Sequence, residues 1–158
     1  MDADLRSPNV GVQLGIDSEV GFLEALTSQV EDGQAILKSD SAPRLSVLPA
    51  GRVDHGIDPE LIANGAFSAA IARWREKYDV VLLDSPPVLP VADARILARH
   101  ADGTILVVWA ERTWRADVVE ALSYLDSAGG RLWGSVFVGS PRRRRYGYAY
   151  NYGSGKHA

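Results

Sequence analysis

The chain has 158 residues, enough for one domain with a buried core, and its 46% hydrophobic and 23% charged residues are ordinary for a globular protein. The formal net charge of −3 gives the chain as a whole no bias towards nucleic acid or anionic membranes. The absence of cysteine excludes disulfides and thiolate metal sites, and no apolar run approaches the ~18 residues that span a bilayer.

Signals for helices and strands alternate along the chain, so the sequence predicts an α/β fold with a mostly parallel sheet flanked by helices. Asp17 or Ser18 is the expected cap of the first helix, and Asp58-Pro59 is a typical helix start. The predicted elements are, in chain order, a helix over 22–33, a strand within 44–51, a helix over 58–78, a strand over 80–84, a helix over 93–100, a strand over 103–110, a helix over 116–128 and a strand over 132–138.

The segment 80–84 is the centre of this prediction. Four consecutive Val and Leu residues lead directly into Asp84, and Pro86 and Pro87 then end the strand. A run without alternation predicts a strand buried on both faces. Ligands of parallel sheets bind at the carboxyl ends of the strands, which is where Asp84 lies. The alternative is that Asp84 only caps a turn.

Three features of this sequence occur in a characteristic order: an Asp-x-Asp-x-Arg motif at residues 2–6, the acidic strand end at 80–87, and a tail of alternating tyrosines after four arginines. Together they resemble the bacterial tyrosine kinases of capsule and exopolysaccharide biosynthesis, P-loop proteins related to the MinD and ParA ATPases. The first motif is similar to that family's Walker A-prime motif, and 80–87 is similar to its Walker B motif. Residues 91–94 and 102–108 are similar to the next helix and strand.

The chain departs from the family pattern at three points. The family's phosphate loop, G-x-x-x-x-G-K-[ST], occurs nowhere in this sequence, and neither does its subunit-contact helix with Glu and Arg. Val138 stands near the position where relatives carry an adenine-recognising Asn. We therefore expect residues 1–140 to form a partial P-loop kinase domain, incomplete at the N-terminus, that has no kinase activity alone. Its strands would then have bare edges open to another chain.

The resemblance assigns roles to three carboxylates. Asp4 and Asp84 would hold Mg²⁺, partly through water, and Asp2 would take the proton of the acceptor hydroxyl. Phosphoryl transfer requires mainly positioning and charge stabilisation, and Mg²⁺ is usually held by one or two carboxylates. The family implies ATP as well as Mg²⁺. The alternative is that all three are ordinary surface carboxylates, and Arg6 could either meet a phosphate or pair with a carboxylate.

Residues 141–158 are predicted to be a flexible tail. Its alternating tyrosines would be the phosphate acceptors that the resemblance implies: Tyr146, Tyr148, Tyr150 and Tyr152. Four phosphates would turn this basic tail acidic. One alternative is an unmodified aromatic tail. Another is binding of single-stranded nucleic acid through arginines and stacked rings, but nucleic acid is not the partner we expect.

The leading functional hypothesis is the C-terminal part of a protein-tyrosine autokinase that regulates capsule or exopolysaccharide synthesis and export. It would be cytoplasmic and peripheral to the inner membrane, held there by a membrane-embedded polysaccharide chain-length regulator. A homo-oligomer or a complete kinase is a further expected partner. The alternatives are a non-catalytic regulatory subunit whose tyrosines a complete kinase phosphorylates, and a MinD- or ParA-like ATPase, against which the tyrosine tail argues.

Overall fold

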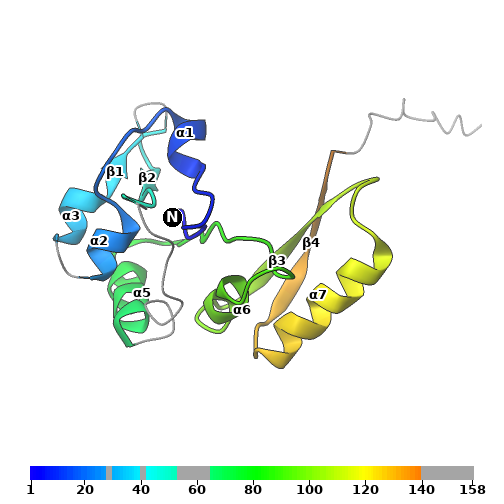
Figure 1. Ribbon diagram of the computed structural model, residues 1–158. Coiled ribbons are helices and arrows are strands. Elements are labelled where there is room, and N and C mark those ends of the chain that lie inside the picture. Colours follow the sequence, from blue (N-terminus) through cyan, green and yellow to red (C-terminus); the bar gives the residue numbers. More distant parts are fainter. Residues whose placement is uncertain (28–29, 40–41, 53–64, 140–158) are drawn as a thin grey trace, which may run out of the picture.

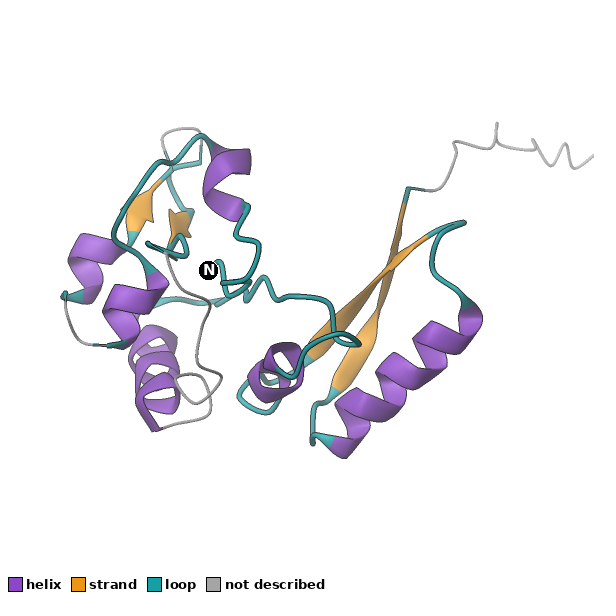
Figure 2. Ribbon diagram, viewed as in Figure 1, coloured by secondary structure: helices purple, strands orange, loops and turns teal. Residues whose placement is uncertain are grey.

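The computed structural model describes residues 1–27, 30–39, 42–52 and 65–139 (Figure 1). The described part of the chain begins with three short helices, continues with two short strands and two helices, and ends with a strand, a helix and a strand, as Figure 2 shows by colour. The elements are α1 (Val10–Leu14), α2 (Phe22–Leu26), α3 (Asp32–Ala35), β1 (Leu37–Lys38), β2 (Ser46–Val47), α5 (Gly65–Lys77), α6 (Asp93–Ala98), β3 (Thr104–Trp109), α7 (Arg115–Ser127) and β4 (Leu132–Val138). None of the described helices is long and apolar enough to cross a membrane.

The C-terminal part of the fold is a parallel strand pair joined by a helix. β3 and β4 pair in parallel, with Val107 opposite Val136 and Trp109 opposite Val138. The connection runs through α7, which contacts β4 and buries Ala121 and Leu125. The predicted strands and helix are confirmed here, because a parallel pair needs a crossover and the sequence supplies an amphipathic helix between two apolar runs.

The prediction that residues 80–84 form a strand buried on both faces is wrong for this structure. The segment is extended, but its ladder is reduced to a single parallel bridge between Asp2 and Asp84. Val81 and Leu83 pack against the core, whereas Val80 and Leu82 are each 72% exposed. The reason is that, among the described residues, this segment has packing neighbours on only one face.

β3 shows the same one-sided packing. Val108 is buried, whereas Ile105 and Val107 are more than half exposed. The parallel register places Val136 of β4, which is also exposed, beside Val107. The apolar run of β3 predicts burial on both faces, but within the described residues only one of its faces is covered.

An aromatic cluster fixes the N-terminal part of the fold. Phe22 of α2 and Phe67 of α5 are fully buried and meet edge to face, with ring centroids 5.9 Å apart. The ring centroids of Trp74 of α5 and Phe22 are 6.3 Å apart. Leu97 of α6 belongs to the same core, and the His100 ring meets Phe67 edge to face at 5.1 Å. Since aromatic side chains bury large areas, this cluster ties α6 firmly to α2 and α5.

The predicted helix over 22–33 is wrong in its extent and its cap. α2 ends at Leu26, and the hydroxyl of Thr27 donates a hydrogen bond to the Leu23 carbonyl at 2.9 Å. Gly33 lies inside α3 instead of ending the helix. The N-cap is Gly21, not Asp17 or Ser18, because the chain passes so close to Pro49 and Ala50 that a Cβ at position 21 would clash with their backbone.

The remaining differences concern short elements and undescribed residues. The strand predicted within 44–51 is only the two-residue β2, which pairs antiparallel with β1, and the sequence analysis foresaw neither β1 nor α1. The helix start at Asp58-Pro59 lies outside the described residues, as does the tail over 141–158. The structure therefore does not test the proposed boundary at residue 140.

Candidate acidic site

The first residues of the chain lie beside the end of the extended segment 80–84. The Asp84 amide donates to the Met1 carbonyl at 2.9 Å, and the Ala3 amide donates to the Asp84 carbonyl at 2.8 Å. The Asp2 amide in turn donates to the Leu48 carbonyl. Backbone hydrogen bonds thus bring the Asp-x-Asp-x-Arg motif next to Asp84, as the resemblance predicted, although the two segments are distant in sequence.

Asp2 is buried, and both oxygens of its carboxylate accept hydrogen bonds from backbone amides. The residue is only 1% exposed. Its Oδ2 accepts from the amides of Asn9 and Val10 at 3.0 Å each, and its Oδ1 accepts from the Asp4 amide at 3.2 Å. Asn9 is the N-cap and Val10 the first residue of α1, so Asp2 satisfies two of the free amides at that helix start. The structure gives Asp2 an organising role, and its predicted role as a base stays a prediction.

Asp4 is half-buried and uses one oxygen to form a tight turn. Its Oδ1 accepts from the amides of Arg6 and Ser7 at 3.2 and 3.0 Å. A carboxylate that bonds its own backbone in this way is held in one orientation. Among the described residues, no hydrogen bond uses Oδ2 of Asp4, so this oxygen is free to meet a ligand.

Asp2, Asp4 and Asp84 together form what we call the acidic group, and Asp84 is its most exposed member. Partial burial of its carboxylate, and then the negative charges of Asp2 and Asp4, raise the pKa of Asp84 above its ordinary value of 3.8. A cation bound beside these three carboxylates would reduce the repulsion between their negative charges. The donor chemistry therefore suits a hard divalent cation with oxygen ligands.

Metal binding here would rest on few protein ligands. In the described parts of the chain, no group of three or more His, Cys, Asp or Glu residues is arranged to hold a metal ion. Two carboxylates with water completing the shell is the usual arrangement for Mg²⁺. Asp4 and Asp84 fit that pattern, whereas the sequence contains no G-x-x-x-x-G-K-[ST] motif for the phosphates of a nucleotide.

Arg6 pairs with a carboxylate that the sequence analysis did not single out. Its Nε donates to Oδ2 of Asp93 at 2.8 Å, and its Nη2 donates to Oδ1 at 3.3 Å. Asp93 is the first residue of α6, and its side chain is only 4% exposed. The sequence signals Asp93 only as the start of a helix, and nothing in its local pattern shows that Arg6 lies opposite.

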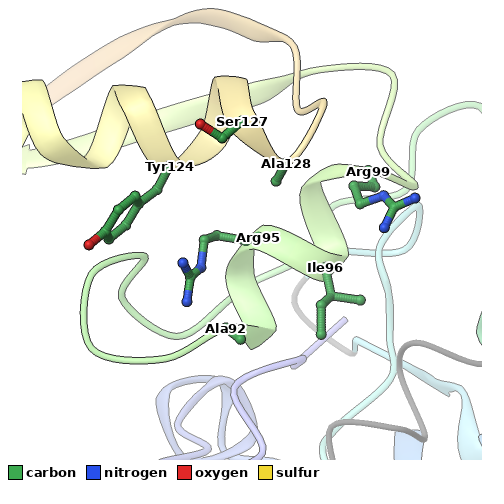
Figure 3. A pocket seen from close by; sticks show the side chains of 7 residues that line it. All are labelled: Ala92, Arg95, Ile96, Arg99, Tyr124, Ser127 and Ala128. Carbon is green, nitrogen blue, oxygen red and sulfur yellow. The ribbon is translucent and has the colours of Figure 1, made fainter.

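A separate hollow of about 280 Å³ lies between α6 and α7 (Figure 3). None of the three predicted site carboxylates lines it. The Arg95 guanidinium lies over the Tyr124 ring, 4.8 Å from its centroid. Figure 3 shows the Arg99 guanidinium pointing away from that of Arg95, so the two cations do not converge on one ligand.

Comparison with known proteins finds relatives that match this chain over most of its length. No family model matches the chain. The putative tyrosine-protein kinase EpsB of Ralstonia solanacearum is 33% identical over 154 residues, which are 97% of this chain and 20% of that protein. Tyrosine-protein kinase YwqD of Bacillus subtilis is 30% identical over 95% of this chain and 62% of its own length.

Solved structures agree with the sequence matches. The kinase domain of Escherichia coli tyrosine kinase ETK superposes with a TM-score of 0.84 at 26% identity, over 96% of this chain and 58% of that one. The VpsO kinase domain superposes with a TM-score of 0.80 at 31% identity, over 86% of this chain and 66% of that one. The chain is a relative of the bacterial tyrosine kinases. The predicted P-loop NTPase-like α/β fold is thereby confirmed.

The kinship with the bacterial tyrosine kinases covers most of this chain but only part of its relatives. The chain spans about a fifth of EpsB and 62% of YwqD. The resemblance drawn from the acidic motifs is confirmed, whereas no comparison tests the individual site residues. The tyrosines expected to accept phosphate, Tyr146, Tyr148, Tyr150 and Tyr152, lie outside the described residues.

Proposed function

We propose that this chain is the acidic-motif and tyrosine-tail part of a protein-tyrosine autokinase that regulates capsule or exopolysaccharide synthesis and export. The observation that carries the proposal is the backbone pairing of Met1, Asp2 and Ala3 with Asp84, which gathers acidic side chains from two distant segments. The kinship with the bacterial tyrosine kinases supports the reaction class.

Asp4 and Asp84 are the residues that would hold Mg²⁺, partly through water. When bound, Mg²⁺ and ATP would supply the phosphoryl group and neutralise charge on it. The free Oδ2 of Asp4 and the exposed Asp84 carboxylate would provide the protein ligands. Asp2 would be the base, and its buried, hydrogen-bonded carboxylate would have to become accessible before it could meet an acceptor hydroxyl.

The chain alone is expected to transfer no phosphate, because its sequence contains no phosphate loop. The test is turnover of ATP by the purified chain, with Asp84→Ala as the control. Turnover that exceeds the Asp84→Ala background would contradict this expectation. Equal and negligible rates for both proteins would support it.

The absence of a phosphate loop from the sequence also favours a second candidate, a non-catalytic regulatory subunit that presents tyrosines to a complete kinase. Incubation with a complete kinase such as YwqD and ATP, followed by mass spectrometry of the tail, tests both candidates. A variant with all four tail tyrosines replaced by Phe is the control. Phosphate on the wild-type tail that is unaffected by Asp84→Asn would favour the subunit, whereas dependence on Asp84 would favour a catalytic part.

The proposed setting is the cytoplasmic side of the inner membrane. A membrane-embedded chain-length regulator would hold the protein there, and a second copy or a complete kinase would be a further partner. Co-purification with the membrane fraction only when that regulator is expressed would support this location. Co-purification without the regulator would contradict it.

A further inference from the structure

We propose that Asp93 is a positioning residue for the cation site, and that it acts through Arg6 without touching the cation. The proposal rests on the proposed function in one respect, since it takes Asp4 and Asp84 as the carboxylates that bind a divalent cation. What it adds is a second link between the two acidic segments, made by side chains in addition to the backbone bridge.

Asp93 is a firm anchor. Both of its oxygens accept hydrogen bonds from the Arg6 guanidinium, at 2.8 and 3.3 Å, in the two-pronged geometry that fixes orientation as well as distance. The Asp93 side chain is only 4% exposed, whereas that of Arg6 is 42% exposed, so the carboxylate is the fixed end of this pair. Asp93 begins α6, which Leu97 joins to the aromatic core. Asp93 therefore cannot shift without moving α6.

Arg6 transmits this anchoring to Asp4. The Arg6 side chain is held by Asp93, and its backbone amide donates to Oδ1 of Asp4, as does the neighbouring amide of Ser7. Because Oδ1 is held by these amides, the direction of Oδ2 depends on where Arg6 is held. The loop over 85–92 joins Asp84 to Asp93, so the ion pair and the backbone bridge together close a ring of chain that includes Asp4 and Asp84.

The charge of Arg6 and its positioning of Asp4 have opposite expected effects on cation affinity, so the proposal can be tested. Arg6 is a cation close to Asp4, so removing its charge would strengthen binding of a divalent cation if charge were all that mattered. If Arg6 positions Asp4, the same change weakens binding. Arg6→Lys keeps the charge but loses the planar two-pronged contact, so it separates geometry from charge.

The experiment titrates the full chain with Mn²⁺ alone and measures affinity by the relaxation of water protons, with thermal melting of each variant in parallel. Arg6→Gln, Arg6→Lys and Asp93→Asn are each expected to bind about ten-fold more weakly or worse, as is common when residues that orient metal ligands are changed. The double variant Arg6→Gln with Asp93→Asn should bind no worse than the weaker single variant. Arg75→Gln, which breaks the exposed Arg75–Asp102 pair, is the matched control and should match wild type.

The outcomes separate this inference from the proposed function. Mn²⁺ binding by wild type that Asp84→Asn abolishes, but that Arg6→Gln and Arg6→Lys leave equal or tighter, would overturn the positioning role while the cation site stands. Wild type that binds Mn²⁺ no better than a variant with both Asp4→Asn and Asp84→Asn would overturn the cation site and this inference together. If Arg6→Gln melts far below the Arg75→Gln control, the comparison rests on Arg6→Lys.

Discussion

Replacing Asp2 by Ala should destabilise this protein strongly. The carboxylate accepts three backbone hydrogen bonds in a site that is 1% exposed, from Asp4, Asn9 and Val10. Hydrogen bonds to a charged group contribute about 1.5–3 kcal/mol each, so three bonds at the lower value give about 4.5 kcal/mol. In a domain of this size each kcal/mol is about 2–4 °C in melting temperature, which predicts a fall of about 10 °C.

Asp4→Ala is the matched comparison for this measurement. Its side chain also accepts two backbone amides, but these lie in exposed surroundings where water replaces the lost bonds. We expect a loss of less than about 1 kcal/mol. Urea and thermal denaturation of the three proteins at neutral pH give the free energies of unfolding directly.

The result for Asp2 also bears on its predicted catalytic role. A residue that serves only as a base can be removed with little effect on folding, whereas an organising residue cannot. If Asp2→Ala unfolds within about 1 kcal/mol of wild type, the structural account of Asp2 is refuted and the role as a base gains support. A large loss would mean that kinetic effects of this variant cannot be assigned to chemistry alone.

Three further predictions concern charge, cation binding and the apolar faces. Because the pKa of Asp84 is raised, the folded chain binds the Asp84 proton more tightly than the unfolded chain does. Stability is therefore lost as the pH rises from about 4 through the folded pKa. Asp84→Asn should melt at a higher temperature than wild type at pH 7 and at the same temperature at about pH 3. Mg²⁺ at a hundred times its Kd should stabilise wild type by about 2.7 kcal/mol and so raise its melting temperature, but not that of Asp84→Asn. An equal rise in both would argue against the site. Val107→Lys should leave the melting temperature unchanged, whereas Val108→Lys should prevent folding, since Val107 is 63% and Val108 only 5% exposed.

The sequence was sufficient for elements whose signal is local. The helix and strands between Thr104 and Val138 were predicted nearly to the residue, because apolar periodicity and Gly129-Gly130 mark their limits. The meeting of Asp2 with Asp84 was predicted only through the resemblance to a family. Nothing within either segment shows that the other lies beside it.

Other features were missed because they depend on tertiary contacts. The burial of Asp2 follows from α1, whose short helix has a weak sequence signal, and the partner of Arg6 lies in a helix start that looks like any other. The apolar run at 80–83 predicted burial on both faces, but composition cannot tell which neighbours are present to cover a face. Gly21 became a helix cap through its close approach to Pro49, which no local pattern reveals.

The one-sided packing of Val80, Leu82, Ile105 and Val107 has a calorimetric consequence. Anything that covers these side chains removes apolar surface from water and must lower the heat capacity of the system, whereas a cation that settles on carboxylates does so with little change of that kind. Calorimetric titrations at two temperatures give the heat-capacity change of binding. This change would distinguish a ligand of the acidic group from a macromolecule that covers these exposed apolar side chains, even where the two affinities are the same.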